Sequence, residues 1–408
     1  MRYIDFVDES YKPSKDDLIC EFYVETQGIP LEEGMGGVAA ESSIGTWTEL
    51  TTVKPYVESL HATVYDINGN NCKIAYPSGL FERGNMPNIL SSIAGNVFGL
   101  DDLRRLRLND VKFPEWLEKS FQGPRYGIQG VRGLLDVEDR PLVGTIVKPK
   151  LGLRTEDHAQ VAYEAWSGGC DIVKDDENLA SQDFNRFEDR VIETLEARDR
   201  AEEETGESKV YMVNVTSMAE EMVDRAEFVE DSGGRYMMVD IITCGWSALQ
   251  YLREQELELV IHAHRAGHAA FTRLDTHGIS MVVLAKIARL IGVDQLHIGT
   301  AVGKMSEEKE EVLSNVTAIT QPLFGMKRVF PVASGGLHPG LVPDLVDIFS
   351  RDIIIQAGGG IHGHPDGSVS GAMAMRQALD AKLEGIDPED YAESHKELQR
   401  ALETWSKV

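Results

Sequence analysis

A lysine and three acidic residues follow one another in the segment 168–182, which reads GGCDIVKDDENLASQ. The apolar run 170–173 leads directly into these charged residues, and this order is typical of a buried strand with a functional end. Because alternate side chains of a strand share a face, we expect Lys174 and Asp176 to point the same way. Glu177 then lies where the strand opens into its loop. The segment predicts a lysine and two carboxylates at one place.

Two interpretations of this cluster are open. In the first, a buried lysine and its carboxylates form a structural ion pair. In the second, Asp176 and Glu177 supply the hard oxygen ligands that Mg²⁺ prefers. An ammonium cannot bind a cation, so Lys174 joins such a site only if its neutral amine first captures CO2 as a carbamate. That conversion requires a lowered lysine pKa, which burial and nearby cations would supply.

The composition is ordinary for a globular protein, with 408 residues, 42% hydrophobic and 26% charged. The formal net charge of -27 argues against a nucleic-acid partner, because phosphate recognition needs a basic surface. The N-terminus MRYIDFVDES has no apolar signal core, and no long apolar run is present, so we expect neither export nor a membrane span. The cysteines lack metal-ligand spacing, which favours free thiols in a reducing cytoplasm. They are Cys20, Cys72, Cys170 and Cys244.

Short apolar runs separated by helix-length segments recur after residue 141. They cover residues 142–150, 171–177, 210–216, 236–243, 259–265, 295–300, 329–334 and 352–358. Eight such repeats predict an α/β fold, a parallel (β/α)8 TIM barrel over residues 126–408 that ends in C-terminal helices. In these barrels the site lies at the carboxyl ends of the strands, so polar residues there are candidates.

Residues 1–125 have a different pattern and predict a smaller N-terminal α+β (ferredoxin-like) domain. Four β-rich runs alternate with two helix-like stretches. The runs are 18–24, 46–53, 62–67 and 72–76, and the helical stretches are 31–42 and 86–97. Glu41, Thr46 and Trp47 lie in a polar loop after the first helix, and Asn96 lies at the end of the second. Taken alone, these residues are more often caps or packing residues than functional ones.

Cationic and imidazole side chains follow the first and fifth barrel strands. Lys148 and Lys150 have the same parity, which places two cations near the carboxylates of the second strand. His264 ends the fifth strand and Arg265 follows it. These residues add acid, base and anion-binding groups to the predicted site.

His264 and His268 are four residues apart, a spacing that two zinc ligands can have on a helix. The glutamate of an HExxH pattern is missing, and no third soft ligand is evident. We therefore expect His262 and His268 to be structural.

The ends of the last three strands predict an anionic, phosphorylated substrate. His297 ends the sixth strand, and Lys304 lies at the tip of the Gly-containing loop that follows. Such a loop can close over a ligand, and its lysine suits an anion. Strands seven and eight end in the glycine-rich turns SGGLHPG and QAGGGIHG, whose backbone N–H groups can hold phosphate.

These residues resemble a known family. GGCDIVKDDE matches the pattern Gly-x-Asp-[Phe/Ile]-x-Lys-x-Asp-Glu of the large subunit of ribulose bisphosphate carboxylase/oxygenase, Rubisco. Further motifs occur in the family's order: AAESSIGTWTEL, GNVFG, TIVKPKLGL, HRAGHAAFTR, HIGTAVGK, SGG and GGG. The resemblance covers nearly the whole chain and is greatest to the archaeal form III enzymes. Those enzymes generally work without a small subunit, in nucleoside or AMP salvage.

The resemblance implies a role for each candidate residue. Lys174 would be carbamylated by an activating CO2 and would bind Mg²⁺ together with Asp176 and Glu177. Lys148 and His264 would be the acid/base groups, and Lys304 would clamp the developing carboxylate. The substrate-binding residues would be Lys150, Arg265, His297, Ser334, Gly335, Gly336, Gln356, Gly358 and Gly359, with Glu41, Thr46, Trp47 and Asn96 from the neighbouring subunit.

The implied activity is that of a carbon–carbon lyase that carboxylates ribulose 1,5-bisphosphate to two 3-phosphoglycerate, with O2 as a competing substrate. The implied assembly is a homodimer or a higher oligomer of dimers, located in the cytoplasm.

Two alternatives are open. One is a Rubisco-like enolase or isomerase of a phosphorylated ketone in sulfur salvage. Such proteins typically lose several of the residues named above, whereas Lys148, Lys150, His264, His297 and Lys304 are all present here. The other is a catalytically silent barrel that serves as a binding or scaffold protein, with Lys174 merely ion-paired.

Overall fold

The computed structural model describes residues 2–303 and 308–405. The chain divides into two compact units, Met1–Gln122 with Gly267–Ile291, and Gly123–Ala266 with Gly292–Val408. The sequence predicts a domain boundary at residue 125, with the segment 267–291 in the barrel domain. In the structure, that segment groups with the N-terminal unit.

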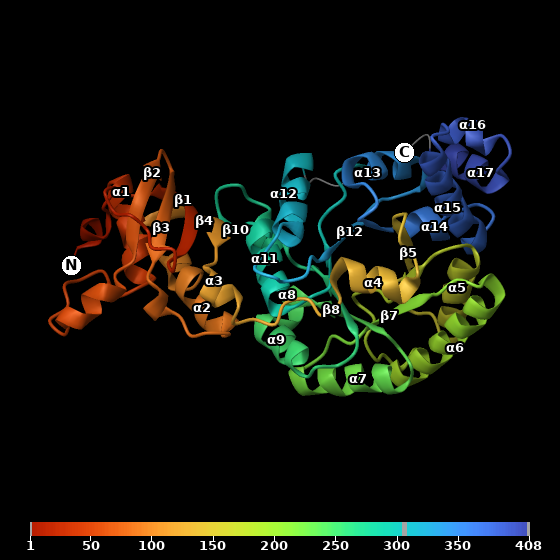
Figure 1. The fold of residues 1–408 in the computed structure, drawn as a ribbon, viewed down its shortest axis with the longest axis horizontal. Helices are drawn as coiled ribbons and strands as arrows, with labels where there is room; N and C mark the ends of the chain where they lie inside the picture. Colours follow the sequence, from red (N-terminus) through yellow and green to blue (C-terminus); the bar gives the residue numbers. More distant parts are fainter. Residues whose placement is uncertain (1, 304–307, 406–408) are drawn as a thin grey trace. The chain divides into compact units, whose positions relative to one another are not determined.

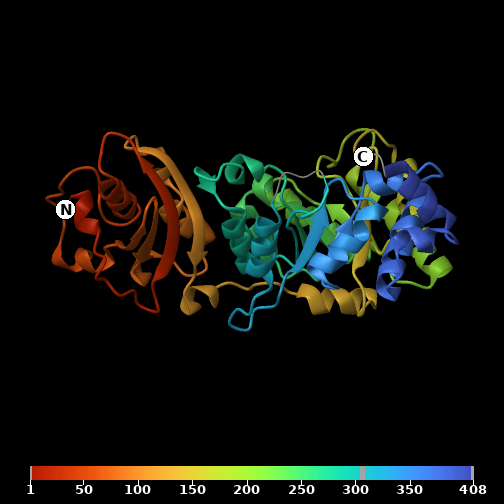
Figure 2. The same ribbon diagram turned by 90° about the horizontal axis from the view of Figure 1, so that it is seen from above.

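The second unit is a closed barrel of eight parallel strands (Figures 1 and 2). The strands are β5 (Leu142–Ile146), β6 (Ile172–Lys174), β7 (Val210–Asn214), β8 (Tyr236–Asp240), β9 (Val260–His264), β11 (Gln295–His297), β12 (Phe330–Ser334) and β13 (Ile354–Gln356). Their order around the barrel is β11-β12-β13-β5-β6-β7-β8-β9. All eight strands expected from the sequence are present, which confirms the TIM barrel.

Helices connect the barrel strands and surround them (Figure 1). They are α4 (Gly127–Leu135), α5 (Thr155–Ser167), α6 (Phe187–Thr205), α7 (Ala219–Asp231), α8 (Ile241–Cys244), α9 (Trp246–Glu254), α12 (Lys309–Thr320), η5 (Pro339–Leu341), α13 (Val342–Phe349), α14 (Gly359–His362), α15 (Ser368–Glu384), α16 (Pro388–Ala392) and α17 (Lys396–Trp405). Helix α6 has residues that favour helix ends at both of its termini. Glu188 and Asp189 lie in its first turn, and Gly206 ends it in the left-handed conformation (φ 69°).

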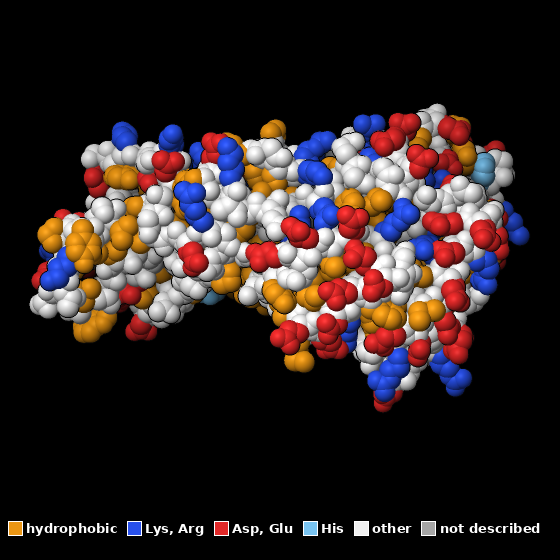
Figure 3. Space-filling model, turned by 60° about the horizontal axis from the view of Figure 1, so that its bottom comes forward, with side chains coloured by type: hydrophobic (Ala, Val, Ile, Leu, Met, Phe, Trp, Pro, Cys, Tyr) orange, Lys and Arg blue, Asp and Glu red, His pale blue; other side chains and the backbone are white. Residues whose placement is uncertain are grey.

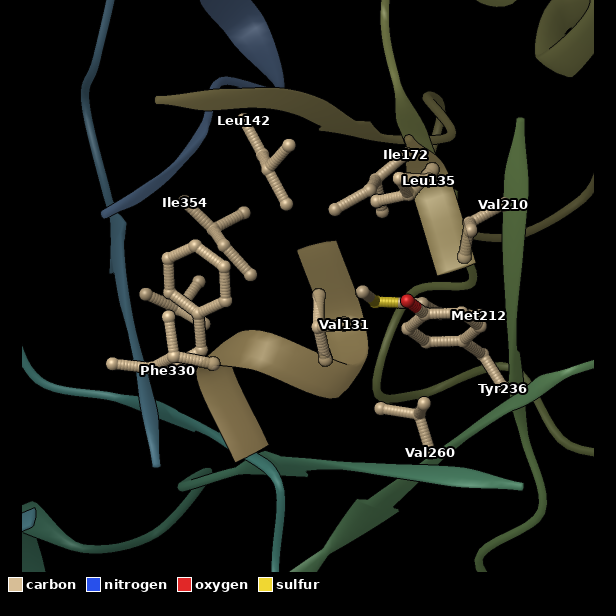
Figure 4. Packing of buried hydrophobic residues seen from close by; sticks show 12 residues of the cluster. Val131, Leu135, Leu142, Ile172, Val210, Met212, Tyr236, Val260, Phe330 and Ile354 are labelled. Atoms are coloured by element: carbon tan, nitrogen blue, oxygen red, sulfur yellow. The ribbon is translucent and has the colours of Figure 1, made fainter. Parts of the chain in front are cut away.

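Apolar side chains fill the amino-terminal end of the barrel. Val131 of α4 lies among residues from the beginnings of the strands, including Leu142, Ile172, Val210 and Ile354 (Figure 4). With this end filled by hydrophobic packing, the strand residues that can do chemistry lie at the opposite, carboxyl end.

The N-terminal unit contains a five-stranded mixed sheet in the order β10-β4-β1-β3-β2. The strands are β1 (Leu18–Thr26), β2 (Thr63–Asn68), β3 (Asn71–Tyr76), β4 (Leu103–Lys112) and β10 (Gly278–Ile279). The helices are η1 (Tyr3–Phe6), α1 (Leu31–Glu41), η2 (Pro55–Leu60), η3 (Ser78–Leu80), α2 (Met86–Ile93), η4 (Asn96–Gly99), α3 (Glu115–Glu118), α10 (Ala269–Thr272) and α11 (Met281–Ile291). Alternate residues of β1 from Leu18 are buried, as expected for a sheet with one covered face. The predicted α+β class is confirmed.

The strand expected at residues 46–53 is absent, and that prediction is wrong. The segment forms bends and turns and is mostly exposed to solvent. Its Thr, Trp and Val residues favour strands only where a neighbouring strand and a buried face receive them. Strand β4, rich in Arg, was not expected, yet it pairs with β1 along most of its length.

Acidic side chains are spread over the face of the molecule shown in Figure 3, with Lys and Arg side chains between them. Within residues 2–303 and 308–405, no helix combines the length and apolar character needed to cross a membrane.

Candidate active site

Lys174 ends strand β6 inside the barrel, with only 1% of its surface exposed. Its Nζ atom donates to the backbone carbonyl of Asp175 at 2.8 Å and lies 3.2 Å from the sulfur of Met238 in β8. Burial lowers the pKa of this amine, although the negative charges of Glu177 and Asp176 raise it in part. In the described part of the chain, no carboxylate forms an ion pair with Lys174. The amine is therefore placed to lose its proton.

Asp176 lies just beyond β6 and is almost completely buried. Its Oδ2 accepts a hydrogen bond from Lys148 Nζ at 2.7 Å, and its Oδ1 accepts from the side chain of Asn178 at 3.0 Å. Burial alone would raise the pKa of Asp176, but the hydrogen bonds from Lys148 and Asn178 lower it. Asp176 is thus an ionised carboxylate at the mouth of the barrel.

The two lysines expected to point to the same side after the first strand have different surroundings in the structure. Strand β5 ends at Ile146, so Lys148 and Lys150 lie in the following loop rather than on one strand face. Lys148 reaches Asp176, whereas Lys150 is exposed to solvent.

His264 ends strand β9 and contacts two acidic residues. Its Nδ1 lies 2.7 Å from Oδ1 of Asp240, and its Nε2 lies 3.8 Å from Oε2 of Glu177. A carboxylate on Nδ1 holds the proton there and leaves Nε2 to accept a proton. His264 therefore has the orientation of a general base beside Glu177.

His297 and Ser334 are brought together from neighbouring strands. His297 Nδ1 lies 2.7 Å from Ser334 Oγ, and His297 Nε2 lies 2.9 Å from His262 Nε2. Burial lowers the pKa of both histidines well below 6.5, and nearby cationic groups lower it further. His262, expected to be structural, is buried and hydrogen-bonded to Gln295, and it also supports His297. Arg265, which directly follows β9, is buried as well.

The two glycine-rich turns follow strands β12 and β13. Gly335 and Gly336 have φ values of 113° and 68°, which side chains rarely tolerate. A Cβ atom on Gly358 would lie 3.2 Å from Cε of Lys148, so this turn passes close to that lysine. Gly359 begins α14, and the buried Gln356 ends β13.

Comparison with known proteins supports one family over the whole chain. Residues 127–405 match the model of the ribulose bisphosphate carboxylase large chain, catalytic domain, and residues 5–117 match its N-terminal domain. A ribulose bisphosphate carboxylase from Methanocaldococcus jannaschii is 52% identical over 98% of this chain and 100% of its own length. The chain belongs to the Rubisco large-chain family. As a member it is an enzyme of the ribulose bisphosphate carboxylase type.

Solved structures agree with this assignment. An octameric Rubisco from Pyrococcus horikoshii superposes with a TM-score of 0.96 at 50% identity and covers 100% of this chain and 97% of its own. A dimeric archaeal Rubisco from Hyperthermus butylicus gives 0.92 at 47% identity, with 100% of both chains covered. These archaeal neighbours fit the form III resemblance.

The donor set of this Rubisco site suits a divalent cation only if Lys174 is modified. Within the described residues, no group of three or more His, Cys, Asp or Glu side chains is arranged to hold a metal ion. Asp176 and Glu177 provide two carboxylates, and a carbamate on the buried Lys174 would provide the third oxygen donor. The same result gives no support to zinc at His264 and His268.

The candidate residues from the N-terminal domain lie in the first unit. Glu41 ends α1 and accepts a hydrogen bond from Tyr3 Oη at 2.8 Å. Trp47, which follows Thr46 in the loop after α1, is 81% exposed, and Asn96 begins η4. Lys304 lies outside the described residues.

Three residues that touch the site were not predicted from the sequence. Asp240 contacts His264, and the sequence could have indicated it because it ends the fourth strand. Asn178 donates to Asp176, and the sequence could have indicated it because it directly follows Glu177. His362 in α14 bonds Thr145 at 3.0 Å, and burial together with the charge of Lys148 lowers its pKa to about 4. His362 lies in the glycine-rich turn QAGGGIHG, but its contact with Thr145 of β5 could not be predicted from the local sequence.

Proposed function

We propose that this Rubisco adds CO2 and water to ribulose 1,5-bisphosphate and releases two molecules of 3-phosphoglycerate, using Mg²⁺ and a carbamylated Lys174. The observation that carries the proposal is the state of Lys174. Its amine is buried, its pKa is lowered, and it lies beside two carboxylates without forming an ion pair to either within the described chain. A structural ion pair or a silent scaffold would not require a lysine in this state.

Activation begins at the amine of Lys174. Its neutral nitrogen bonds the carbon of CO2, the nitrogen loses a proton to solvent, and an anionic carbamate results. The neutral amine thereby becomes a negative group, next to Asp176 and Glu177. Mg²⁺ bound by these three groups would polarise the substrate's oxygens and stabilise negative charge that develops on them.

The protein's own residues then move protons. Nε2 of His264 accepts a proton from the carbon beside the ketone, and Asp240 stabilises the resulting imidazolium. The ammonium of Lys148 stabilises charge that appears only as the reaction proceeds, and it can return a proton to the product carbon.

The two phosphate groups require donors at separated positions. Arg265, His297 and the turn from Ser334 to Gly336 supply one set. The turn from Gln356 to Gly359 supplies the other, at the place where barrels of this type commonly bind phosphate. Lys304 would close over the substrate and clamp the new carboxylate.

We further propose that O2 competes with CO2 and that the substrate derives from nucleoside or AMP salvage. The archaeal relatives support the form III assignment on which this rests. A homodimer, alone or within a higher oligomer of dimers, is proposed as the active unit, because the two neighbours of known structure are octameric and dimeric.

The test is direct. The protein is incubated with bicarbonate and Mg²⁺, ribulose 1,5-bisphosphate is added, and 3-phosphoglycerate is measured. Two products per CO2 consumed are expected, and chelation of Mg²⁺ should abolish turnover. Isomerised sugar phosphate without carbon fixation would instead identify a Rubisco-like isomerase.

A further inference from the structure

The loop that follows strand β6 carries Asp176 and Glu177, and buried side chains from β7 and α6 donate hydrogen bonds to its backbone. Asn214, at the end of β7, is 1% exposed. Its Nδ2 donates to the carbonyl oxygen of Glu177 at 3.1 Å and to that of Leu179 at 3.0 Å. Its Oδ1 accepts from the backbone N–H of Thr216 at 3.1 Å, which fixes the amide's orientation. One side chain therefore ties two carbonyls of the acidic loop to the neighbouring strand.

A buried arginine holds the continuation of the same loop. Arg190 of α6 has no exposed surface. It donates to the carbonyl oxygen of Ala180 at 2.7 Å and to that of Asn185 at 3.1 Å. Its Nε also lies 3.3 Å from Oδ2 of Asp175. The planar guanidinium thus links α6 to both ends of the loop.

Asp175 completes this arrangement on the outer side of the barrel. Its Oδ1 accepts a hydrogen bond from Tyr211 Oη at 2.6 Å, and its Oδ2 accepts from the backbone N–H of Asn214 at 3.0 Å. His158 Nε2 lies 3.2 Å from Oδ1. Side chains alternate along an extended chain, so Asp175 points outward while Lys174 points inward to Met238.

Asn214 and Arg190 contact the loop backbone and Asp175, whereas Lys148 and His264 contact the acidic side chains of Asp176 and Glu177. Carbonyls of residues 177, 179 and 180 are held by only two donors. A backbone fixed at these points leaves the attached carboxylates little freedom, so less conformational entropy is lost when a cation binds.

We propose that Asn214 and Arg190 are positioning residues of the Mg²⁺ site, acting through the loop backbone to hold Asp176 and Glu177 ready for the cation. This inference rests on the proposed function, because it presumes that the site binds Mg²⁺.

The test compares three variants with a matched control. Asn214→Ala removes the donor to two carbonyls, and Asn214→Ser retains a hydroxyl donor. Arg190→Lys keeps the positive charge beside Asp175 but removes the planar guanidinium that donates to several acceptors at once. Arg132→Lys is the control, because Arg132 is equally buried and donates to the carbonyls of Val137, Arg140 and Arg351 and to Asp352, at the amino-terminal end of the barrel.

Two quantities are measured on each whole protein: the melting temperature without metal, and the Mg²⁺ affinity by calorimetry in saturating bicarbonate. We expect Asn214→Ala and Arg190→Lys to weaken Mg²⁺ binding about 10-fold or more. Asn214→Ser should have an Mg²⁺ affinity between those of the wild type and Asn214→Ala. If Asn214→Ala does not fold, Asn214→Ser replaces it in the comparison. Arg132→Lys should lower the melting temperature and leave the affinity unchanged.

Either of two results would overturn the inference. One is an unchanged Mg²⁺ affinity in the Asn214 and Arg190 variants, which would make these residues structural only. The other is an equal loss of Mg²⁺ affinity in Arg132→Lys, which would show that the effect comes from destabilisation of the barrel as a whole. Failure of the wild-type protein to bind Mg²⁺ with bicarbonate would reject the proposed function itself, and the inference with it.

Discussion

The ammonium of Lys148 lies 2.7 Å from Oδ2 of Asp176, so a residue after the first barrel strand pairs with a carboxylate after the second. The pair is asymmetric, because Asp176 is almost fully buried while the Lys148 side chain is 30% exposed. One side of Lys148 faces the turn at Gly358, and the other faces the acidic cluster. This relationship joins the predicted acid/base group to the predicted metal site.

Lys148→Met should remove the cation while keeping a side chain of similar length. We expect turnover to fall at least about 100-fold, because a positioned proton donor is worth that much in many enzymes. Mg²⁺ binding should persist, since Asp176 loses a cation that competes for it. Steady-state assays and calorimetry measure the two effects. Wild-type turnover in this variant would contradict the assigned role.

The carbamate on Lys174 should depend on pH in a defined direction. The amine reacts only when neutral, and burial lowers its pKa below the ordinary 10.5. Carbamate therefore increases as the pH rises through the lowered pKa, with half-conversion below the value for a free lysine. Carbon-13 NMR of the protein over a pH series, at constant dissolved ¹³CO2, measures this. Lys174→Ala should show no such signal, and labelling that persists in it would place the carbamate elsewhere.

Asp240→Asn should impair His264 without removing it. An amide at this position no longer favours the proton on Nδ1 or stabilises a charged imidazole. We expect kcat to fall about 100-fold, with KM changed little. The pH profile of kcat should also move, a change that simple destabilisation would not produce. An unaltered profile at unaltered kcat would exclude Asp240 from this role.

Glu118 in the N-terminal unit should make stability depend on pH. Burial raises its pKa from 4.5 to about 7, although Arg289 and Lys286 oppose the shift. The folded state therefore keeps a proton that the unfolded state has lost, and the resulting stabilisation declines as the pH rises from 4.5 through about 7.

Glu118→Gln should remove this dependence and raise the free energy of unfolding above pH 7 by about 1 to 2 kcal/mol. Thermal melts at several pH values provide the measurement. Glu115→Gln, an exposed position on the same helix, is the control and should have almost no effect. Equal changes in both variants would show that burial of Glu118 is not the cause.

Mixed dimers should test whether Glu41 completes a neighbouring subunit's site. Glu41→Gln and Lys174→Ala should each be inactive alone. A refolded equimolar mixture should recover about a quarter of wild-type activity, because half of the dimers are mixed and each has one intact site. Activity of Glu41→Gln alone, or no recovery in the mixture, would contradict the shared site.

Much of the barrel could be predicted from local sequence patterns. The eight apolar runs ending in polar or glycine residues identified the strands, because parallel strands covered on both faces need continuous apolar side chains. The adjacency of Lys174, Asp176 and Glu177 in the chain was enough to predict that they would lie together. The glycine turns at Gly335 and Gly336 were also visible, and the structure gives both glycines positive φ values.

Tertiary structure decided the remaining features, because they depend on residues that are distant in the sequence. The lowered pKa of Lys174 requires burial against β8, and the orientation of His264 requires Asp240 from that strand. The strand expected at 46–53 failed for the same kind of reason, since strand-forming residues need a partner strand to pair with. The sequence by itself determined the barrel strands and the charged groups at their ends, because both follow from local patterns, whereas closure of the barrel decided which of these groups touch and which are removed from water.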